Sequence, residues 1–152
     1  MRFKVYLAGA ITGLSWEEVR ARFREASELL SSIGYDVLNP LAGKGHLARE
    51  TSLKATGYKH PTSTDRAIIG RDYWMVQQAD IILCNLANSK SVSIGSVCEL
   101  AWAYSQHKHV IVVMEQQNIH QHSFVKEMAD MVFETDDEAY RYLRRLSAMG
   151  FD

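Results

Sequence analysis

The sequence predicts an α/β fold: an open, doubly wound parallel sheet of five strands, of the Rossmann or flavodoxin-like kind. Short runs rich in Val, Ile and Leu recur along the chain and are almost continuously apolar, as expected of strands covered on both faces. Segments with helical periodicity separate these runs. Such an alternation of strand and helix is typical of a parallel sheet with right-handed crossovers.

Four clear strand-like runs and one weaker run are expected. The four clear runs are residues 3–10, 35–39, 80–86 and 109–114, and the weaker run is 131–133. The first helix opens with a capping box at Ser15-Trp16-Glu17-Glu18 and ends at Gly34. Further helices are expected over 65–78, from 95 or 96 to about 106, and from 136 to about 149.

Length and composition predict one domain over residues 1–152, in a cytoplasmic protein. Seventeen Lys plus Arg against eighteen Asp plus Glu give a formal charge of -1, which argues against a nucleic-acid polymer or a membrane surface as partner. Cys84 and Cys98 both lie in apolar runs, so two buried thiols in a reducing compartment are expected. We expect no signal peptide, and no apolar run approaches the roughly 20 residues of a spanning helix.

The segments after the strands are where a doubly wound sheet places its ligand crevice. Residues 9–13 form a glycine loop that does not match a dinucleotide fingerprint, so a tight turn is its simplest interpretation. The segment 40–64 is longer than twenty residues, which is typical of a lid, a binding loop or a disordered segment. Its basic and histidine residues include Lys44, His46, Arg49, Lys54, Lys59 and His60.

Glu99 is the first candidate for chemistry. The pattern places it in the first turn of an otherwise apolar helix, where the helix N-terminus stabilises an ionised carboxylate that serves as nucleophile or base. A capping role is the alternative. Ser91, Ser93 and Ser96, with Gly95, offer hydroxyls and free amides to an oxyanion or phosphate, or else form a solvated turn.

Asp72 is the second candidate. It lies inside the second predicted helix among apolar neighbours, a setting that raises a carboxyl pKa and suits a general acid. The alternative is an ion pair with Arg66 or Arg71 on the helix surface. Tyr6 lies inside the first strand, where a buried hydroxyl needs a polar partner.

Neither a metal site nor a cofactor is expected. Histidines stand two residues apart at 107 and 109 and at 120 and 122, but no third ligand accompanies either pair. The chain also lacks the Gly-Lys-Ser/Thr ending of a Walker-type loop.

In combination, these residues resemble the nucleoside 2-deoxyribosyltransferase family, including its nucleoside 5′-monophosphate N-glycosidase branch. The resemblance runs from Val5 to about Ala139. Its anchors, in chain order, are Val5-Tyr6-Leu7-Ala8-Gly9-Ala10-Ile11-Thr12-Gly13, Asn39-Pro40, Arg71-Asp72-x-Trp74 leading to Ala79-Asp80, and Ser93-x-Gly95-x-x-x-Glu99.

The resemblance implies a role for each candidate. Glu99 would attack C1′ of the sugar and form a covalent glycosyl-enzyme, Asp72 would help to protonate the leaving base, and Tyr6 would hold the nucleophile by a hydrogen bond. The family also forms homodimers or larger homo-oligomers, in which a polar residue of a neighbouring subunit completes each site; Ser123, or a residue of 118–122, matches it. The expected substrate-binding residues are Gly9, Ile11, Thr12, Gly13, Ser93, Gly95, Ser96 and Ser123.

One position favours a particular branch. Six residues before the nucleophile, deoxyribosyltransferases tend to carry Asp and the monophosphate hydrolases carry Ser, and this chain has Ser93. A carboxylate would repel a phosphate and a hydroxyl would not. The sequence therefore favours a nucleoside 5′-monophosphate N-glycosidase that releases free base and (deoxy)ribose 5-phosphate, although Thr12 stands where some hydrolases have Arg. The alternatives are a base-exchanging 2-deoxyribosyltransferase, a non-catalytic nucleotide-binding module and a flavin module of the flavodoxin type.

Overall fold

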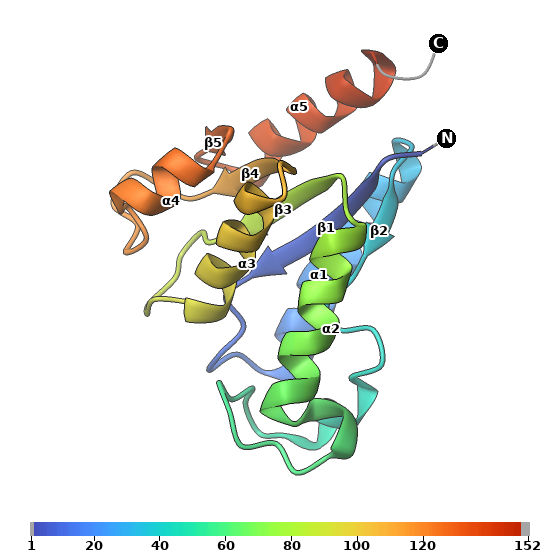
Figure 1. Ribbon diagram of the computed structural model, residues 1–152, viewed down its shortest axis with the longest axis vertical. Helices are drawn as coiled ribbons and strands as arrows, with labels where there is room; N and C mark the ends of the chain where they lie inside the picture. The colour runs from blue at the N-terminus through green and yellow to red at the C-terminus, as the bar shows by residue number, and fades with distance from the viewer. Residues whose placement is uncertain (1, 150–152) are drawn as a thin grey trace.

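The computed structural model describes residues 2–149 and contains one five-stranded sheet with helices on both faces (Figure 1). All strand pairs are parallel, in the order β2-β1-β3-β4-β5. The predicted doubly wound sheet is therefore confirmed, including its weakest strand. The strands are β1 (Lys4–Gly9), β2 (Asp36–Leu38), β3 (Ile81–Asn85), β4 (His109–Val113) and β5 (Met131–Phe133).

The helices follow the predicted pattern with one addition. They are α1 (Trp16–Ser32), α2 (Asp65–Gln78), α3 (Ile94–Ser105), α4 (Ser123–Met128) and α5 (Asp136–Met149). The predicted capping box opens α1, because the Ser15 side chain accepts from the Glu18 amide and the Glu18 carboxylate accepts from the Ser15 amide. Gly34 follows the end of α1 with φ +106°, a conformation that favours glycine. The six-residue α4 was not predicted, since so short a helix carries no periodic signal.

Two apolar layers hold the sheet. Val5 and Leu7 of β1 point to the layer that contains α1 and α5, whereas Tyr6 and Ala8 point to the layer of α2, α3 and α4. Figure 1 shows α2 and α3 side by side over that second face. The alternation along β1 therefore directs the Tyr6 hydroxyl toward the two helices that carry Asp72 and Glu99.

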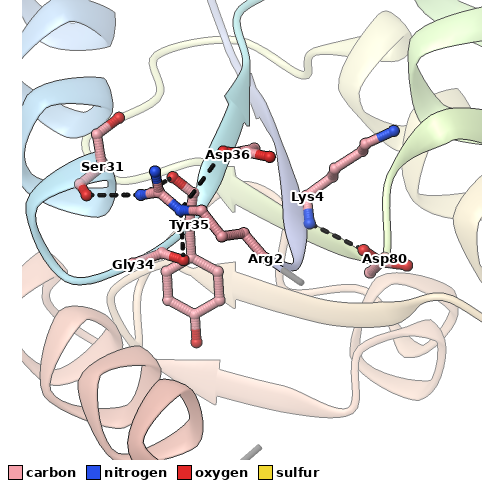
Figure 2. A network of polar contacts seen from close by, with 7 residues as sticks. All are labelled: Arg2, Lys4, Ser31, Gly34, Tyr35, Asp36 and Asp80. Carbon is pink, nitrogen blue, oxygen red and sulfur yellow. Dashed lines mark hydrogen bonds and ion pairs between the residues drawn. The ribbon is translucent and has the colours of Figure 1, made fainter. Parts of the chain in front are cut away.

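Polar contacts fix the amino ends of the strands (Figure 2). The Lys4 amide donates to Asp80 Oδ2 at 2.8 Å, which ties the start of β1 to the start of β3. The Arg2 guanidinium lies 3.5 Å from the Asp36 carboxylate. It also donates to the carbonyl oxygens of Ser31, Gly34 and Tyr35. The amino ends of these strands are thus occupied by contacts within the protein, so a ligand is to be sought at their carboxyl ends.

The long segment 40–64 is an ordered wall rather than a disordered loop. It contains two short 3-10 helices, η1 (Gly45–Arg49) and η2 (Pro61–Ser63). Leu47 and Leu53 are buried in the core beside α1. The Gly13 amide donates to the Leu53 carbonyl and the Leu53 amide donates to the Leu14 carbonyl, both at 2.8 Å, which fastens this segment to the loop after β1.

The prediction of two buried thiols is wrong for one of them. Cys84 in β3 is buried, but Cys98 is exposed because it lies on the outer side of α3, and neither forms a disulfide. None of the helices in the described part of the chain combines the length and the apolar character needed to cross a membrane.

Candidate active site

A cavity of about 430 Å³ opens at the carboxyl end of β1, where the strand order reverses between β1 and β3. Ligands of doubly wound sheets bind at such a switch point. The cavity brings together residues from β1, the loop after it, segment 40–64, α2 and the start of α3. Of the predicted site residues it is lined by Tyr6, Gly9, Ile11, Thr12, Asp72, Ser93, Gly95, Ser96 and Glu99.

Glu99 lies at the buried end of this cavity, beside Tyr6. The pKa of Glu99 is raised to about 8 as the net result of its surroundings: burial raises it most, the Tyr6 hydroxyl lowers it, the nearby Asp72 carboxylate raises it, and Lys44 lowers it. Burial, and then the charges of Glu99 and Asp72, raise the pKa of Tyr6 well above its ordinary value, so its hydroxyl keeps its proton. Tyr6 Oη and Glu99 Oε2 are both buried and lack a partner of regular hydrogen-bond geometry, so their mutual contact is a loose one.

The expected position of Glu99 in its helix is wrong. Helix α3 begins at Ile94 with Ser93 as its N-cap, so Glu99 lies in the second turn and no acidic residue occupies the first. At that distance the free amides of the helix N-terminus do not favour the ionised form strongly. Burial dominates instead, and it favours the protonated carboxyl group.

Asp72 forms an ion pair inside the cavity. Its Oδ1 lies 3.4 Å from Lys44 Nζ, and the exposed fractions of the two side chains are only 14% and 4%. Burial raises the pKa of Asp72, as its apolar neighbours predicted, and Lys44 opposes that rise. The partner is therefore a lysine 28 residues earlier in the chain, not the arginines on the same helix that were the predicted alternative.

The start of α3 offers polar groups to the cavity. The Ser93 side chain does not cap the helix; its Oγ lies 2.8 Å from Ser96 Oγ, and Ser96 is buried. The buried His120 accepts a hydrogen bond from the Ser93 amide at Nε2 (2.8 Å), while its Nδ1 lies 2.9 Å from Asn118 Oδ1. An amide oxygen only accepts, so the proton is assigned to Nδ1. The sequence indicated His120 as a rejected metal ligand and as part of the stretch 118–122 that the family resemblance assigns to a neighbouring subunit's site; within its own chain it positions Ser93.

Gly9 is required by close packing of the two strands at the switch point. A Cβ at this position would lie 2.8 Å from the Asn85 carbonyl oxygen of β3. Two predicted substrate-binding residues are not among those that line the cavity. Gly13 holds segment 40–64 through its amide, and Ser123 begins α4 on the exposed surface.

Several lining residues were not among the sequence candidates. Pro40, Leu47, Tyr58 and Ile68 form an apolar wall, and Lys44 and Lys54 add cationic groups. Such a wall suits the face of a flat heterocycle. The sequence indicated Lys44 and Lys54 alike, as basic residues of the long segment after β2, and it carried no signal of which of these side chains line the cavity.

A doubly wound sheet with two carboxylates beside one cavity at its switch point has the parts that glycosyl transfer on a small substrate requires. Residues 5–140 match the family model of nucleoside 2-deoxyribosyltransferase, and the chain belongs to this family. The prediction of an enzyme of this family is confirmed. No curated protein matches the sequence.

Solved structures of low sequence identity share the fold. The 2-deoxyribosyltransferase of Bacillus psychrosaccharolyticus is 18% identical, with a TM-score of 0.64 and 91% of each chain covered. The CMP N-glycosidase of Clostridium botulinum is 17% identical, with a TM-score of 0.56, covering 95% of this chain and 98% of that one. A Leishmania mexicana deoxyribosyltransferase is 17% identical, with a TM-score of 0.60 and coverage of 94% and 97%. Transferases and a hydrolase therefore share this architecture.

Proposed function

We propose that this protein is a nucleoside 5′-monophosphate N-glycosidase that acts through a covalent glycosyl-Glu99 intermediate. The observation that carries the proposal is the shared cavity, in which the Glu99 carboxyl group lies beside Tyr6 while the Asp72 and Lys44 pair lines the same space. Retaining cleavage of a glycosidic bond needs a carboxylate nucleophile and a proton donor on opposite sides of that bond. These residues supply both.

The reaction runs in two steps. The ionised Glu99 attacks C1′ of the sugar, the bond from C1′ to the base nitrogen breaks, and the base takes a proton from the Asp72 side of the cavity. Water then attacks C1′ of the glycosyl ester, which releases the sugar phosphate and regenerates Glu99. The protonated Tyr6 hydroxyl lies beside the carboxylate and lowers its pKa, so it stabilises the charged form that attacks.

The start of α3 is the proposed phosphate site. The hydroxyls of Ser93 and Ser96 and the first amides of the helix face the cavity, and none of these amides has a side-chain cap. Hydroxyls and helix N-terminal amides favour a phosphate. A carboxylate at Ser93 would repel it. Thr12, which also lines the cavity, offers one further hydroxyl.

Base exchange between deoxynucleosides is the second candidate function. It is favoured by the family to which the chain belongs and by the two transferases that share its fold. The two functions share the glycosyl-enzyme and differ in the acceptor, which is water in a hydrolase and a second base in a transferase.

We also propose that the protein is a homo-oligomer whose sites are completed across the subunit interface. Large apolar side chains are exposed mainly on the layer of α2, α3 and α4, where Ile94 is 75% and Phe124 71% exposed. Other exposed residues there are Ile69, Tyr73, Trp74, Val92, Tyr104 and Ile119. A second copy that covers this layer would carry Ser123, the neighbour of Phe124, toward the partner's cavity.

Substrate tests distinguish the two candidates. Deoxynucleosides and their 5′-monophosphates are incubated with the protein, with and without an acceptor base, and the products are resolved by chromatography. We expect base release from monophosphates only, and Ser93→Asp to reverse that preference toward unphosphorylated nucleosides. Base exchange on unphosphorylated nucleosides by the wild-type protein would overturn the choice of hydrolase.

A further inference from the structure

Lys44 carries a buried ammonium group that has more N–H donors than acceptors around it. It follows β2, its side chain is only 4% exposed, and it lines the same cavity as Glu99. Its one hydrogen-bond acceptor within residues 2–149 is Asp72, at 3.4 Å. An ammonium carries three N–H donors, and buried donors are rarely left unpaired. A ligand atom that accepts hydrogen bonds is therefore the missing partner of Lys44.

A second cation supports the ionised state of Asp72. Arg71 is adjacent to Asp72 on α2, and its Nε and Nη2 atoms are buried without a hydrogen-bond partner among residues 2–149. The charges of Lys44 and Arg71 both lower the pKa of Asp72, in opposition to burial. Burial lowers the pKa of Lys44, the Asp72 carboxylate opposes that shift, and Arg71 adds to it; the net lowering eases release of the Lys44 proton. Burial still raises the pKa of Asp72 on balance, but the geometry gives the carboxylate the role of a holder: its Oδ1 lies 3.4 Å from Lys44 Nζ, and the ammonium is the group with N–H donors left for a ligand.

We infer that the Lys44 ammonium, held in place by Asp72, is the group that protonates the departing base; this rests on the proposed N-glycosidase reaction. As Glu99 bonds to C1′, the electron pair of the glycosidic bond moves to the base, and one Lys44 proton moves to a ring nitrogen or carbonyl oxygen of that base. Lys44 becomes a neutral amine. The water that hydrolyses the glycosyl ester gives its hydroxyl to C1′ and returns the proton to Lys44.

The assignment also defines the class of base. Because an ammonium donates hydrogen bonds and accepts none, the base must present an acceptor toward Lys44. Unmodified pyrimidines and purines do so and need a proton to leave as neutral molecules. A base with a fixed positive charge, such as N7-methylguanine, needs no proton and is repelled by Lys44.

Two variants of Lys44 test the inference, with base release from the preferred monophosphate as the readout. Lys44→Arg keeps the positive charge but removes a proton that can be transferred, since a guanidinium stays protonated. Lys44→Met removes both. We expect each variant to slow base release by about 10²- to 10⁴-fold, the usual contribution of a general acid. Lys59→Met, the same change at an exposed residue of the same segment, serves as the matched control and should retain the wild-type rate.

The dependence of the rate on the acidity of the leaving base separates a proton donor from a residue with a purely structural role. Loss of a structural residue would slow all substrates by the same factor. Substrates with ring-halogenated bases of increasing acidity need less proton donation, so the deficit of both variants should shrink along the series. Thermal unfolding checks that the variants are folded; if Lys44→Met is not, Lys44→Arg decides the question.

Failure of the inference and failure of the proposed function are distinguishable. If the wild-type protein is active and Lys44→Arg keeps its rate to within about threefold, Lys44 is not the donor, and Asp72 is restored to that role. An unchanged leaving-group dependence would overturn the inference in the same way. If the wild-type protein releases no base from any nucleotide, the proposed function and this inference fall together.

Discussion

At the scale of single residues, the environment of Glu99 sets a conflict between stability and reactivity. A nucleophilic carboxylate must be ionised, yet the pKa of this group is raised to about 8 on balance, with burial as the largest cause. The Tyr6 hydroxyl offsets part of that rise, and the cationic Lys44 also favours the charged form. The pKa of Glu99 therefore lies close to neutral pH, where a fraction of the carboxyl groups is ionised and reactive; shifts of this kind are common among catalytic carboxyl groups.

The first prediction concerns the pH dependence of base release. In the free enzyme the ionised fraction of Glu99 reaches one half at about pH 8, so kcat/KM should rise about eightfold between pH 6.5 and 7.5 and level off above about pH 9. The substrate phosphate titrates near pH 6 and contributes little in that interval. Initial rates at low substrate concentration measure this profile, and a flat profile from pH 6.5 to 8 would contradict the assignment.

The second prediction concerns stability. The raised pKa of Glu99, which makes activity rise with pH, makes the free energy of unfolding fall with pH. Glu99 ionises near 4.5 when unfolded and near 8 when folded, so between these values the folded state binds more protons and stability falls as pH rises. Glu99→Gln should therefore be more stable than wild type at pH 7, by on the order of 3 kcal/mol, and about equally stable at pH 4. Denaturant unfolding at both pH values checks this. If Glu99→Gln were less stable than wild type at pH 7, burial of the ionised Glu99 side chain would not be destabilising, and this prediction would be wrong.

At the scale of elements, the local signals in the sequence were reliable and the long-range ones were not. The capping box at Ser15 and the glycine after α1 predicted the ends of that helix, and apolar runs predicted all five strands. The start of α3 was misplaced by one or two residues, which was enough to put Glu99 in the wrong turn. The contact of Lys44 with Asp72 joins residues 28 apart, and no periodicity signals a pair of that kind.

The third prediction concerns how α3 is positioned. His120→Ala removes the acceptor of the Ser93 amide and the partner of Asn118, and leaving such buried groups unpaired costs about 1–3 kcal/mol. We expect a stability loss of that size, together with a higher KM for monophosphates because Ser93 is displaced. Denaturant unfolding and steady-state kinetics measure the two effects.

A control lies at the other end of the same helix. His107 has φ +57°, a left-handed conformation that costs a histidine more than a glycine. His107→Gly should raise stability by about 0.5–1 kcal/mol with KM unchanged. If His120→Ala left both stability and KM at wild-type values, the role given to His120 would be wrong.

At the scale of the whole molecule, the cavity depends on segments that are far apart in the chain. The switch point between β1 and β3 brings the glycine loop, segment 40–64, α2 and the start of α3 to one edge of the sheet. The doubly wound parallel sheet was predictable from the alternation of strands and helices, whereas its strand order β2-β1-β3-β4-β5 comes from the structure. The ordered fold of segment 40–64 was not, because buried residues such as Leu53 are spaced without helical or strand periodicity.

The fourth prediction concerns self-association. Phe124→Glu places a charge on the apolar layer of α2, α3 and α4, so it should shift the protein to a smaller oligomer in sedimentation velocity and lower its rate of base release at least tenfold. Val132→Lys, at a second exposed apolar residue on the edge strand β5, is the matched control and should change neither. If the wild-type protein sediments as a monomer and is fully active, the proposal that each site is completed by a neighbouring subunit is wrong.

The most direct test of the whole account is to trap the sugar on the enzyme. A nucleoside 5′-monophosphate with fluorine at C2′ destabilises the oxocarbenium-like transition states and lets the glycosyl-enzyme accumulate. We predict that intact-protein mass spectrometry shows one added sugar phosphate per chain with release of one equivalent of base, and that peptide mapping places the adduct on Glu99. Base release with no adduct, or an adduct on another residue, would contradict the mechanism at its centre.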